Sequence, residues 1–419
     1  MRFQRQTIPV EEAVRRLTRL PLSLPEEEVD IFEANGRTLA RDLFSACDLP
    51  PFDRAPLDGF AVRAADTAGA RPDRPVYLTV VETIAAGQVP QMEVAPGTAS
   101  RIMTGAMLPA GADAVVMFEQ TEEPGAVSSR VGIKRHMKAG ENLSRRGEEL
   151  RSGSSIARAG EIIHAGTLAL LAACGFSRVP VVRKPRIGLF ATGSELLDVG
   201  QPLMPGKIRN SNTVMLSAWI AEAGGIPVWL GRLPDDPVKA KQAIERGTEQ
   251  TDAVLTTGGV SVGDFDVIAA LTDEPDVTVL FNRVAMRPGS PTTAALIRGK
   301  VLLALSGNPG ACFLGFHLFA RPLLAALLGQ RWSPLTVQAV LAVSYEKPCP
   351  YPRFLRGRLE ERGTVLYACP EMQDKSGSVS TLAASECLIV IPAGGRGKAA
   401  GETVEVIPHR APSWGGSHR

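Results

Sequence analysis

The sequence predicts a multidomain α/β protein, in which an open, mostly parallel α/β domain is joined to a helical linker domain, a small inserted β domain and a C-terminal β-barrel. Three observations predict this class. Between residues 186 and 328, apolar runs of strand length alternate with helical patterns. Between residues 58 and 140, short β-rich segments lie between two helical stretches, which indicates an insertion. After residue 332 only short strand patterns follow.

Composition narrows the class of function. The net charge of +2 shows no basic excess of the kind that nucleic-acid-binding proteins carry. The six cysteines include no Cys-x-x-Cys pair, which argues against structural zinc and fits reduced thiols. We expect no apolar run to be long enough to cross a bilayer, and residues 1–10 lack the hydrophobic core of a signal peptide. We therefore expect a cytoplasmic protein with neither nucleic acid nor membrane as partner.

The linker domain is predicted to be discontinuous and to contain residues 1–57 and 141–182, with residues 58–140 as the inserted β domain. Residues 9–20 form an amphipathic pattern with Pro9 at its start, and residues 31–43 fit a strand followed by a second helix. A further helical pattern begins at Gly166 and ends at Gly175, a residue type typical of helix ends.

The α/β domain is predicted over residues 183–329. Its first helix begins near Asn212 and ends at Gly224, and its second begins at Asp236, with Pro237 in the first turn. Residues 252–257 form a strand that is apolar on both faces, as a buried parallel strand is. Residues 309–328 form a long apolar helix.

The barrel is predicted over residues 333–410, and residues 411–419 as a disordered tail. The expected barrel strands are residues 336–343, 354–360, 365–369, 387–391 and 403–407.

Polar and glycine clusters of the α/β domain directly follow its apolar runs. These clusters are residues 191–195, 235–237, 258–266, 287–291 and 306–309. Because open parallel sheets bind ligands beyond the carboxyl ends of their strands, we expect the clusters to form one crevice. A crevice with glycine amides, carboxylates and arginines suits a phosphorylated ligand bound with a divalent metal ion.

The glycine-rich loop of residues 257–263 is the most specific of these clusters. It lacks the Gly-Lys-Ser/Thr of the Walker loop and the Rossmann fingerprint, but its amides can still contact oxyanions. Asp264 and Asp266 follow it, and a carboxylate beside a phosphate calls for Mg²⁺, whereas helix capping would explain only one of the two. Arg283 and Arg287 either bind tetrahedral oxyanions or form ordinary salt bridges with Glu195 or Asp266.

Two clusters outside the α/β domain leave alternatives open. Asp58, which precedes Gly59, is either a turn residue or a carboxylate held near a metal or a leaving group, and Thr104 could offer its hydroxyl to an anion. Arg145 and Arg146 lie among acidic residues and either pair with them or face a phosphate. No Ser/His/Asp or Cys/His set is present, so positioning, metal and charge should carry catalysis.

The motifs, taken in order, resemble those of the molybdopterin molybdenumtransferase family, which includes the E domain of gephyrin. The resemblance covers residues 5–410 through the motifs at 51–62, 101–106, 145–148, 192–196, 258–263, 287–289 and 307–309. It implies an α/β domain of the molybdopterin-binding type and an enzyme that uses adenylylated molybdopterin, molybdate and Mg²⁺, releases AMP and places molybdenum on the dithiolene. It also implies an elongated homodimer and contact with a molybdopterin adenylyltransferase.

The resemblance implies roles for individual residues. The catalytic residues would be Asp58 and Thr104, contributed by the partner subunit, with Glu195, Asp235, Asp266, Arg283 and Arg287, and the three α/β-domain carboxylates among them would hold the metal. The ligand-binding residues would be Gly258, Gly259, Ser261, Gly263, Ser290, Ser306, Gly307, Asn308, Pro309, Arg356 and Ser378. Arg283, Arg287 and Ser290 stand where the family usually has lysines, and Ser306 where it often has proline, so anion affinity and metal preference could differ.

Three alternatives remain. A molybdopterin adenylyltransferase shares the α/β domain, but it typically has Thr-Gly-Gly-Thr-Gly where this chain has Thr-Gly-Gly-Val-Ser at residues 257–261, and it lacks the other domains. A tungstate-inserting homologue would share every motif. A scaffold that kept only the fold would not need Asp58, Glu195 and Asp266, which are all present.

Overall fold

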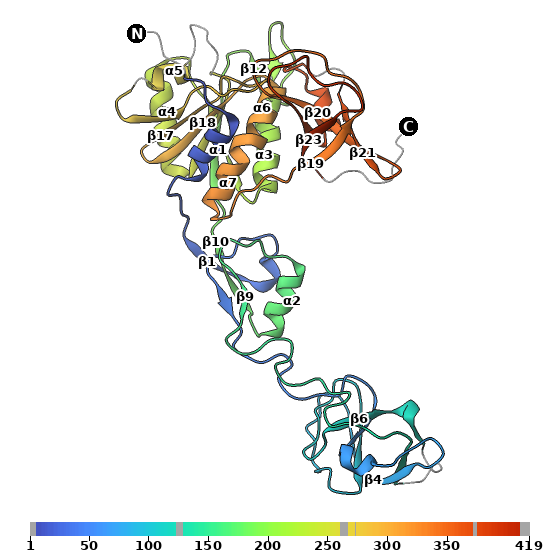
Figure 1. Cartoon of the computed structure of the whole chain (residues 1–419). Coiled ribbons are helices and arrows are strands. Elements are labelled where there is room, and N and C mark those ends of the chain that lie inside the picture. The colour runs from blue at the N-terminus through green and yellow to red at the C-terminus, as the bar shows by residue number, and fades with distance from the viewer. Residues whose placement is uncertain (1–5, 123–128, 260–266, 273, 372–374, 411–419) are drawn as a thin grey trace.

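The computed structural model describes residues 6–122, 129–259, 267–272, 274–371 and 375–410. The molecule is elongated: the α/β domain and the barrel lie side by side at one end, the linker domain forms the middle, and the small β domain lies at the other end (Figure 1). The predicted multidomain α/β class is confirmed. The predicted tail, residues 411–419, lies outside the described residues.

A six-stranded sheet, ordered β14-β11-β15-β18-β17-β16, forms the centre of the α/β domain. Its strands are β11 (Arg186–Ala191), β14 (Ile226–Arg232), β15 (Ala253–Thr257), β16 (Val277–Phe281), β17 (Thr293–Ile297) and β18 (Lys300–Leu305). The first four strands of the order are parallel, and β17 and β16 are antiparallel to their neighbours. Since β14, β11, β15 and β18 point the same way, the loops that follow them meet at one sheet edge. Two short strands that follow β11 in the chain, β12 (Leu196–Leu197) and β13 (Ile208–Arg209), pair with each other in a separate ribbon.

The two predicted helices begin at or close to the expected positions, although the first begins one residue before Asn212 and is capped by Asn210. Asn210 Oδ1 accepts the Thr213 N–H at the start of α3 (Ser211–Glu222), and Asp236 Oδ1 accepts the Lys239 N–H at the start of α4 (Pro237–Gln250). A short helix that the sequence did not predict, α5 (Val267–Thr272), follows the glycine-rich loop.

The long apolar helix consists of α6 (Pro309–Gly315), a π-helical turn (Phe316–Ala320) and α7 (Arg321–Leu327). It is long and apolar enough to span a bilayer, so the expectation that no apolar run reaches that length was wrong. Within the molecule, however, 89% of its most apolar window is buried. The helix is apolar all round because it packs on the sheet on one side and on further helices and the barrel on others.

Helix α1 (Val10–Thr18) corrects one predicted boundary. It was expected in the linker domain, but Val10, Ala13 and Leu17 are buried in the core that also contains the 309–327 helix. Figure 1 shows α1 beside α7 in the α/β lobe. The apolar stripe of α1 therefore packs in the core of the α/β domain. After α1 the chain continues into the linker domain.

The linker domain contains two small antiparallel ribbons and one helix. These are β1 (Glu26–Asp30) with β10 (Arg178–Val182), β2 (Leu43–Phe44) with β9 (Ser155–Ala157), and α2 (Ala165–Ala173). The second helix expected within residues 31–43 is absent from this described stretch, where only a 3₁₀ turn (Ile31–Glu33) forms. Instead, the Gly36 and Leu39 N–H groups bond to the distant carbonyls of Ile163 and Glu161, because the tertiary fold offers these partners.

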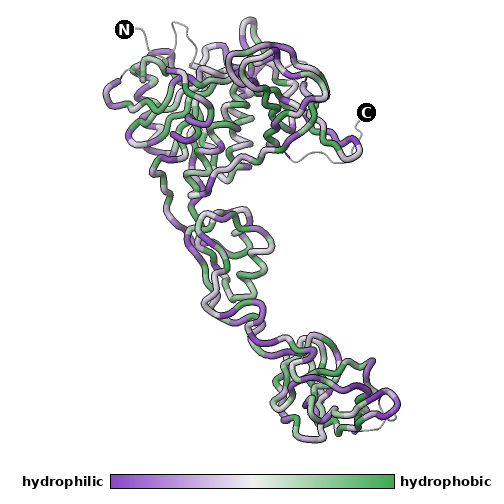
Figure 2. Tube along the Cα trace, in the orientation of Figure 1, coloured by the Kyte–Doolittle hydropathy of each residue, from purple (hydrophilic) through white to green (hydrophobic). Residues whose placement is uncertain are grey.

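The small β domain is one six-stranded sheet, ordered β6-β3-β5-β4-β8-β7, with two short 3₁₀ turns. Its elements are β3 (Gly59–Val62), β4 (Val76–Ile84), β5 (Thr98–Ile102), β6 (Ala114–Met117), β7 (Thr121–Glu122), β8 (Arg130–Ile133) and the turns Ala64–Thr67 and Phe118–Gln120. The segments that connect it to the linker domain are partly hydrophilic (Figure 2).

The C-terminal domain is a closed five-stranded barrel, ordered β19-β21-β20-β22-β23, in which β19 also pairs with β23. Its elements are β19 (Val337–Leu341), β20 (Arg353–Arg362), β21 (Val365–Pro370), α8 (Ser380–Ala384), β22 (Cys387–Ile391) and β23 (Thr403–Pro408). All five strand patterns expected after residue 332 are present.

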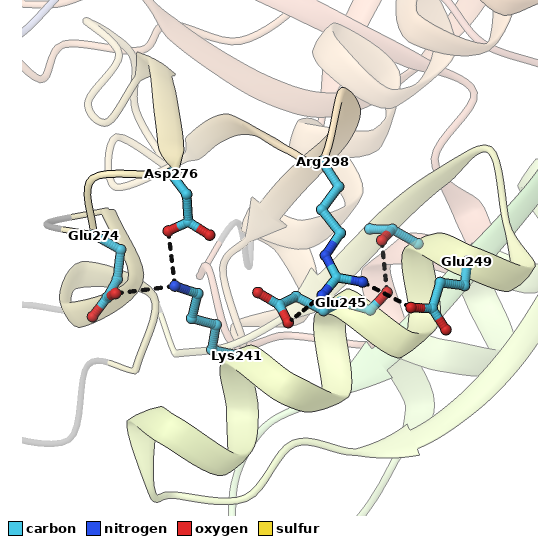
Figure 3. A network of polar contacts seen from close by, with 7 residues as sticks. Lys241, Glu245, Glu249, Glu274, Asp276 and Arg298 are labelled. Carbon is cyan, nitrogen blue, oxygen red and sulfur yellow. Dashed lines mark hydrogen bonds and ion pairs between the residues drawn. The ribbon is translucent and has the colours of Figure 1, made fainter.

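An ion-pair network lies along one side of α4 (Figure 3). Lys241 Nζ lies 3.0 Å from a Glu274 oxygen and 2.8 Å from an Asp276 oxygen. The Arg298 guanidinium contacts Glu245 at 2.9 Å and Glu249 at 2.7 Å. The network joins α4 to the antiparallel end of the sheet, away from the edge where the glycine clusters lie.

Candidate active site

The loops that follow β11, β15 and β18 touch one another at the carboxyl edge of the sheet. A Cβ on Gly307 would lie 3.3 Å from Gly258 Cα, and a Cβ on Gly258 would overlap the side chain of Thr192. Gly258 and Gly259 also have φ values of 87° and 70°, which side chains disfavour. The predicted residues Gly258, Gly259 and Gly307 are therefore brought together, with little room for a side chain at Gly258 or Gly307.

Asn212, in the first turn of α3, joins this group and was not predicted as a site residue. Its Nδ2 donates to the Gly307 carbonyl at 2.8 Å, which ties the start of α3 to the loop after β18. Its Oδ1 is buried and accepts no hydrogen bond in the described structure. Its position near the capping residue Asn210, at the carboxyl edge, is the signal that could have found it.

The carboxylates lie on the same edge but are more exposed. The Glu195 carboxylate, in the loop after β11, folds back over Gly193. Asp235 is exposed after the neighbouring strand β14, while Asp236 is the cap of α4. Within the described ranges, no three His, Cys, Asp or Glu side chains form a group able to hold a metal ion. Asp266, the third predicted metal ligand, lies outside the described residues, as do Ser261 and Gly263.

A cleft of about 330 Å³ lies between the α/β domain and the barrel. It is lined by Arg287, Pro288, Gly289, Ser290, Pro291, Ser306, Asn308, Ala311, Arg353 and Ser376. Four predicted site residues therefore share one cavity: Arg287, Ser290, Ser306 and Asn308. None of the lining residues is acidic, so the described walls carry positive charge and no negative charge.

Local hydrogen bonds shape these walls. Ser290 Oγ donates to the Val284 carbonyl at 2.7 Å, and the Val284 N–H donates to the Ser290 carbonyl at 2.9 Å, which closes the loop that presents Arg287. Ser306 Oγ accepts the Asn308 N–H at 3.2 Å. Asn308 precedes Pro309, the first residue of α6, and its side chain makes no capping bond. The Asn308 amide is thus available to a ligand in the cleft.

The two arginines of the α/β domain differ in position. Arg287 is exposed and lines the cleft, whereas Arg283 does not line it, although its backbone carbonyl accepts the Ile8 N–H at 3.1 Å. Neither side chain forms an ion pair with a carboxylate of the described residues. The alternative salt bridge with Glu195 is therefore absent, and the one with Asp266 falls outside the described part of the chain.

Arg356 and Ser378 were predicted to bind the ligand, but neither lines the cleft. Arg356 is buried, and its guanidinium donates to the Lys375 carbonyl at 2.9 Å and to the Ser378 carbonyl at 3.1 Å. The Gly310 N–H also bonds to the Ser376 carbonyl at 2.8 Å. Arg356 therefore holds the 375–378 loop against the start of α6. The barrel residues that line the cleft are Arg353 and Ser376. The resemblance pointed to the serines of residues 374–378, but no local sequence pattern reveals that Arg353 lies close to Arg287.

Asp58 and Thr104 form a pair in the small β domain. Asp58 Oδ1 accepts the Thr104 N–H at 2.6 Å and the Thr104 hydroxyl at 2.7 Å. The hydrogen bond from the hydroxyl, followed by that from the backbone, holds the pKa of Asp58 below its ordinary value. Asp58 is thus a held carboxylate, in a bend directly before strand β3. The small β domain, which contains the pair, lies at the end of the molecule opposite the α/β domain (Figure 1).

The charged cluster of residues 140–149 pairs with itself and with its neighbours. Arg145 bonds to Asp53 at 2.8 Å, and Arg146 bonds to Asp48 at 2.6 Å. Both arginine side chains are therefore paired, but with aspartates of residues 48–53 and not with the acidic residues of their own cluster. They brace the crossing between the linker domain and the small β domain.

A second cavity, of about 1310 Å³, lies between α1, the π-helical turn and the barrel. Its walls are mostly apolar, and none of the described site residues predicted from the sequence lines it. The smaller cleft, which combines arginines, hydroxyls and nearby glycine turns, is the better candidate for binding an anion.

Comparison with known proteins shows the family of the chain. Three family models match consecutive stretches: "MoeA N-terminal region (domain I and II)" at residues 8–175, "Probable molybdopterin binding domain" at 188–326 and "MoeA C-terminal region (domain IV)" at 338–409. The molybdopterin molybdenumtransferase of Bacillus subtilis (strain 168) is 45% identical over 408 residues, which are 96% of this chain and 94% of that protein. The chain belongs to the molybdopterin molybdenumtransferase family.

Further relatives agree. The molybdopterin molybdenumtransferase of Staphylococcus aureus (strain COL) is 40% identical over 406 residues, 96% of each chain. The crystal structure of a molybdopterin biosynthesis MoeA protein from Pyrococcus horikoshii superposes with a TM-score of 0.83 at 33% identity and covers 96% of this chain and 99% of that one. Membership of the molybdopterin molybdenumtransferase family confirms the predicted enzyme class, a transferase of molybdenum cofactor biosynthesis.

Proposed function

We propose that this chain transfers molybdenum from molybdate to adenylylated molybdopterin and releases AMP. The observation that carries the proposal is the cleft in which Arg287, Ser290 and Asn308 of the α/β domain face Arg353 and Ser376 of the barrel. Its described walls contain no carboxylate, and it lies at the start of α6, beside the glycine turns. Such a wall binds a tetrahedral oxyanion through charge-assisted hydrogen bonds and repels no negative charge.

Each group has a task that its position supports. The Arg287 fork orients the oxyanion, and the Asn308 amide adds neutral hydrogen bonds. The glycine turns at Gly258 and Gly307 allow the phosphate of the nucleotide to approach the backbone. Because charge and orientation lower the barrier of the reaction, no imidazole base is required.

The carboxylates suit a magnesium ion. Mg²⁺ prefers carboxylate oxygens and keeps several waters, and Glu195 and Asp235 are exposed oxygen donors after neighbouring strands of the sheet. We infer that they hold Mg²⁺ together with Asp266. When bound, the ion neutralises charge on the phosphate that leaves with AMP.

We infer further that the enzyme is a homodimer and that its site is completed by the partner. Asp58 is held as an ionised carboxylate by Thr104, yet it lies far from the cleft of its own chain (Figure 1). A second copy that places its small β domain against the α/β domain would bring the Asp58–Thr104 pair to the ligand. We expect this dimer to work in the cytoplasm, apart from nucleic acid and membranes, and to receive its substrate from a molybdopterin adenylyltransferase.

The test is direct. The purified protein is incubated with adenylylated molybdopterin, Mg²⁺ and either molybdate or tungstate, and AMP release is followed, with the Bacillus subtilis relative as positive control. Release with molybdate supports the proposal, and faster release with tungstate at equal concentration would favour the tungstate-inserting alternative. No release with either oxyanion, while the control is active, would reject insertion and favour a scaffold. Formation of adenylylated molybdopterin from ATP and molybdopterin would favour the adenylyltransferase alternative.

A further inference from the structure

Two arginines from different domains lie next to each other at the cleft. Arg287 belongs to the α/β domain, and Arg353 is the first residue of the barrel strand β20. Their backbones form a parallel β-bridge: the Arg287 N–H donates to the Pro352 carbonyl at 3.0 Å, and the Phe354 N–H donates to the Arg287 carbonyl at 2.9 Å. The bridge fixes both residues at the wall of one cavity.

Arg353 carries a charge that the described residues do not neutralise. No ion pair joins it to a described carboxylate, and its buried Nε has no hydrogen-bond partner in the described structure. The guanidinium carbon lies 5.4 Å from the centre of the Tyr345 ring, which restrains the plane of the group. A buried donor without a partner is costly, so a bound group that accepts from Arg353 would recover this free energy.

We propose that Arg353 is an oxyanion-binding residue and forms, with Arg287, a two-arginine clamp across the junction between the α/β domain and the barrel. Because the two domains each contribute one guanidinium, the oxyanion also strengthens the contact between them. The identity of the anion, molybdate, rests on the proposed function. The clamp itself rests on the cavity, the β-bridge and the unpaired donor.

The test measures the binding of molybdate alone, without nucleotide, by titration calorimetry. Arg353→Gln should bind molybdate roughly 10- to 150-fold more weakly than the wild type, the loss expected for one charge-assisted contact. Arg358→Gln is the matched control, because Arg358 lies on the same strand, is exposed and faces Glu371 instead of the cleft. It should bind as the wild type does. Molybdate should also raise the Tm of the wild type more than that of Arg353→Gln.

An unchanged molybdate affinity in folded Arg353→Gln would overturn the clamp. If this variant does not fold, Arg353→Lys replaces it, since Lys keeps the charge but lacks the planar fork. Wild-type affinity in Arg353→Lys would then also overturn the clamp. The two proposals can be rejected separately. If the protein releases AMP but the Arg353 variants bind molybdate as the wild type does, only the clamp is rejected. If molybdate binding depends on Arg353 but no AMP is released, only the transferase reaction is rejected.

Discussion

Thr104 gives both of its hydrogen-bond donors to a single oxygen of Asp58. The Asp58 Oδ1 lies 2.6 Å from the Thr104 nitrogen and 2.7 Å from the Thr104 hydroxyl oxygen. Both bonds favour the ionised carboxylate, and both orient it.

Thr104→Val should therefore shift the acid limb of the pH profile of AMP release to higher pH. The fold lowers the pKa of Asp58, so wild-type Asp58 stays ionised as the pH falls, until the pH reaches this lowered value. Without the hydroxyl, the largest cause of the shift is lost and protonation begins at a higher pH. The measurement is kcat/KM against pH. Thr98→Val, which removes a hydroxyl that bonds only to the Ala95 carbonyl, is the control and should leave the profile unchanged. An unshifted acid limb in Thr104→Val would remove Asp58 from the reaction.

Mixed dimers should recover activity that each parent variant lacks. In a dimer of one Asp58→Ala chain and one Glu195→Gln chain, one composite site carries both changes and the other carries neither. The expected result is AMP release by heterodimers purified with two affinity tags, while both homodimers are inactive. Inactive heterodimers of verified composition would show that the site does not combine these two residues across subunits.

Asp235 and Asp236 are adjacent, but removing each side chain should affect a different property of the protein. Asp236→Ala removes the cap of α4 and should lower the free energy of unfolding by about 1 kcal/mol, with Mg²⁺ dependence unchanged. Asp235→Ala should leave stability unchanged and raise the Mg²⁺ concentration needed for AMP release, because Asp235 is exposed and offers oxygen to the metal. Urea unfolding and Mg²⁺ titration measure the two effects. A wild-type Mg²⁺ requirement in Asp235→Ala would exclude it as a metal ligand.

Gly310→Ala should disturb the contact between the helix and the barrel. The new methyl group would lie 3.0 Å from the Ser376 carbonyl oxygen and would overlap the Arg356 guanidinium, which two backbone carbonyls hold in place. Overpacking of this kind costs roughly 1–3 kcal/mol, measurable by urea unfolding. Gly200→Ala is the control, since a Cβ there meets no atom within 4 Å. Equal stability of the two variants would show that the 375–378 loop moves aside freely.

Arg287→Ala should weaken the binding of molybdate by roughly 1.5–3 kcal/mol, which is about 10- to 150-fold in affinity. Arg287→Lys should stay active, with an altered affinity for molybdate. The reason is that Arg287 lines the cleft and pairs with no described carboxylate. The rate of AMP release is measured against molybdate concentration, with tungstate in parallel. A wild-type dependence in Arg287→Ala would leave Arg287 without a role in anion binding.

Much of the fold follows from local sequence signals. Asp236 places the start of α4, and the start expected near Asn212 lies within two residues of Asn210, the cap that α3 has in the structure. The strand patterns place all five barrel strands, because turn residues and side-chain alternation act within a few positions. The predictions of the fold that were wrong share one cause. Residues 31–43 were expected to form a strand and a helix, but their N–H groups bond to carbonyls far along the chain. Helix α1 lies outside the linker domain because its apolar stripe packs on α7. Such partners lie outside any local window.

Residue types and their spacing were enough to predict the fold class, the family and the edge of the sheet to which Glu195, Gly258 and Gly307 belong, since parallel strands bring the residues that follow them to one side. They did not reveal that Arg353 lines the cleft, that Arg356 supports a loop, or that the small β domain, which contains Asp58, lies far from the α/β domain of its own chain. A side chain's partners across domains are set by packing and register between distant segments. Residue type and spacing along the chain do not specify them.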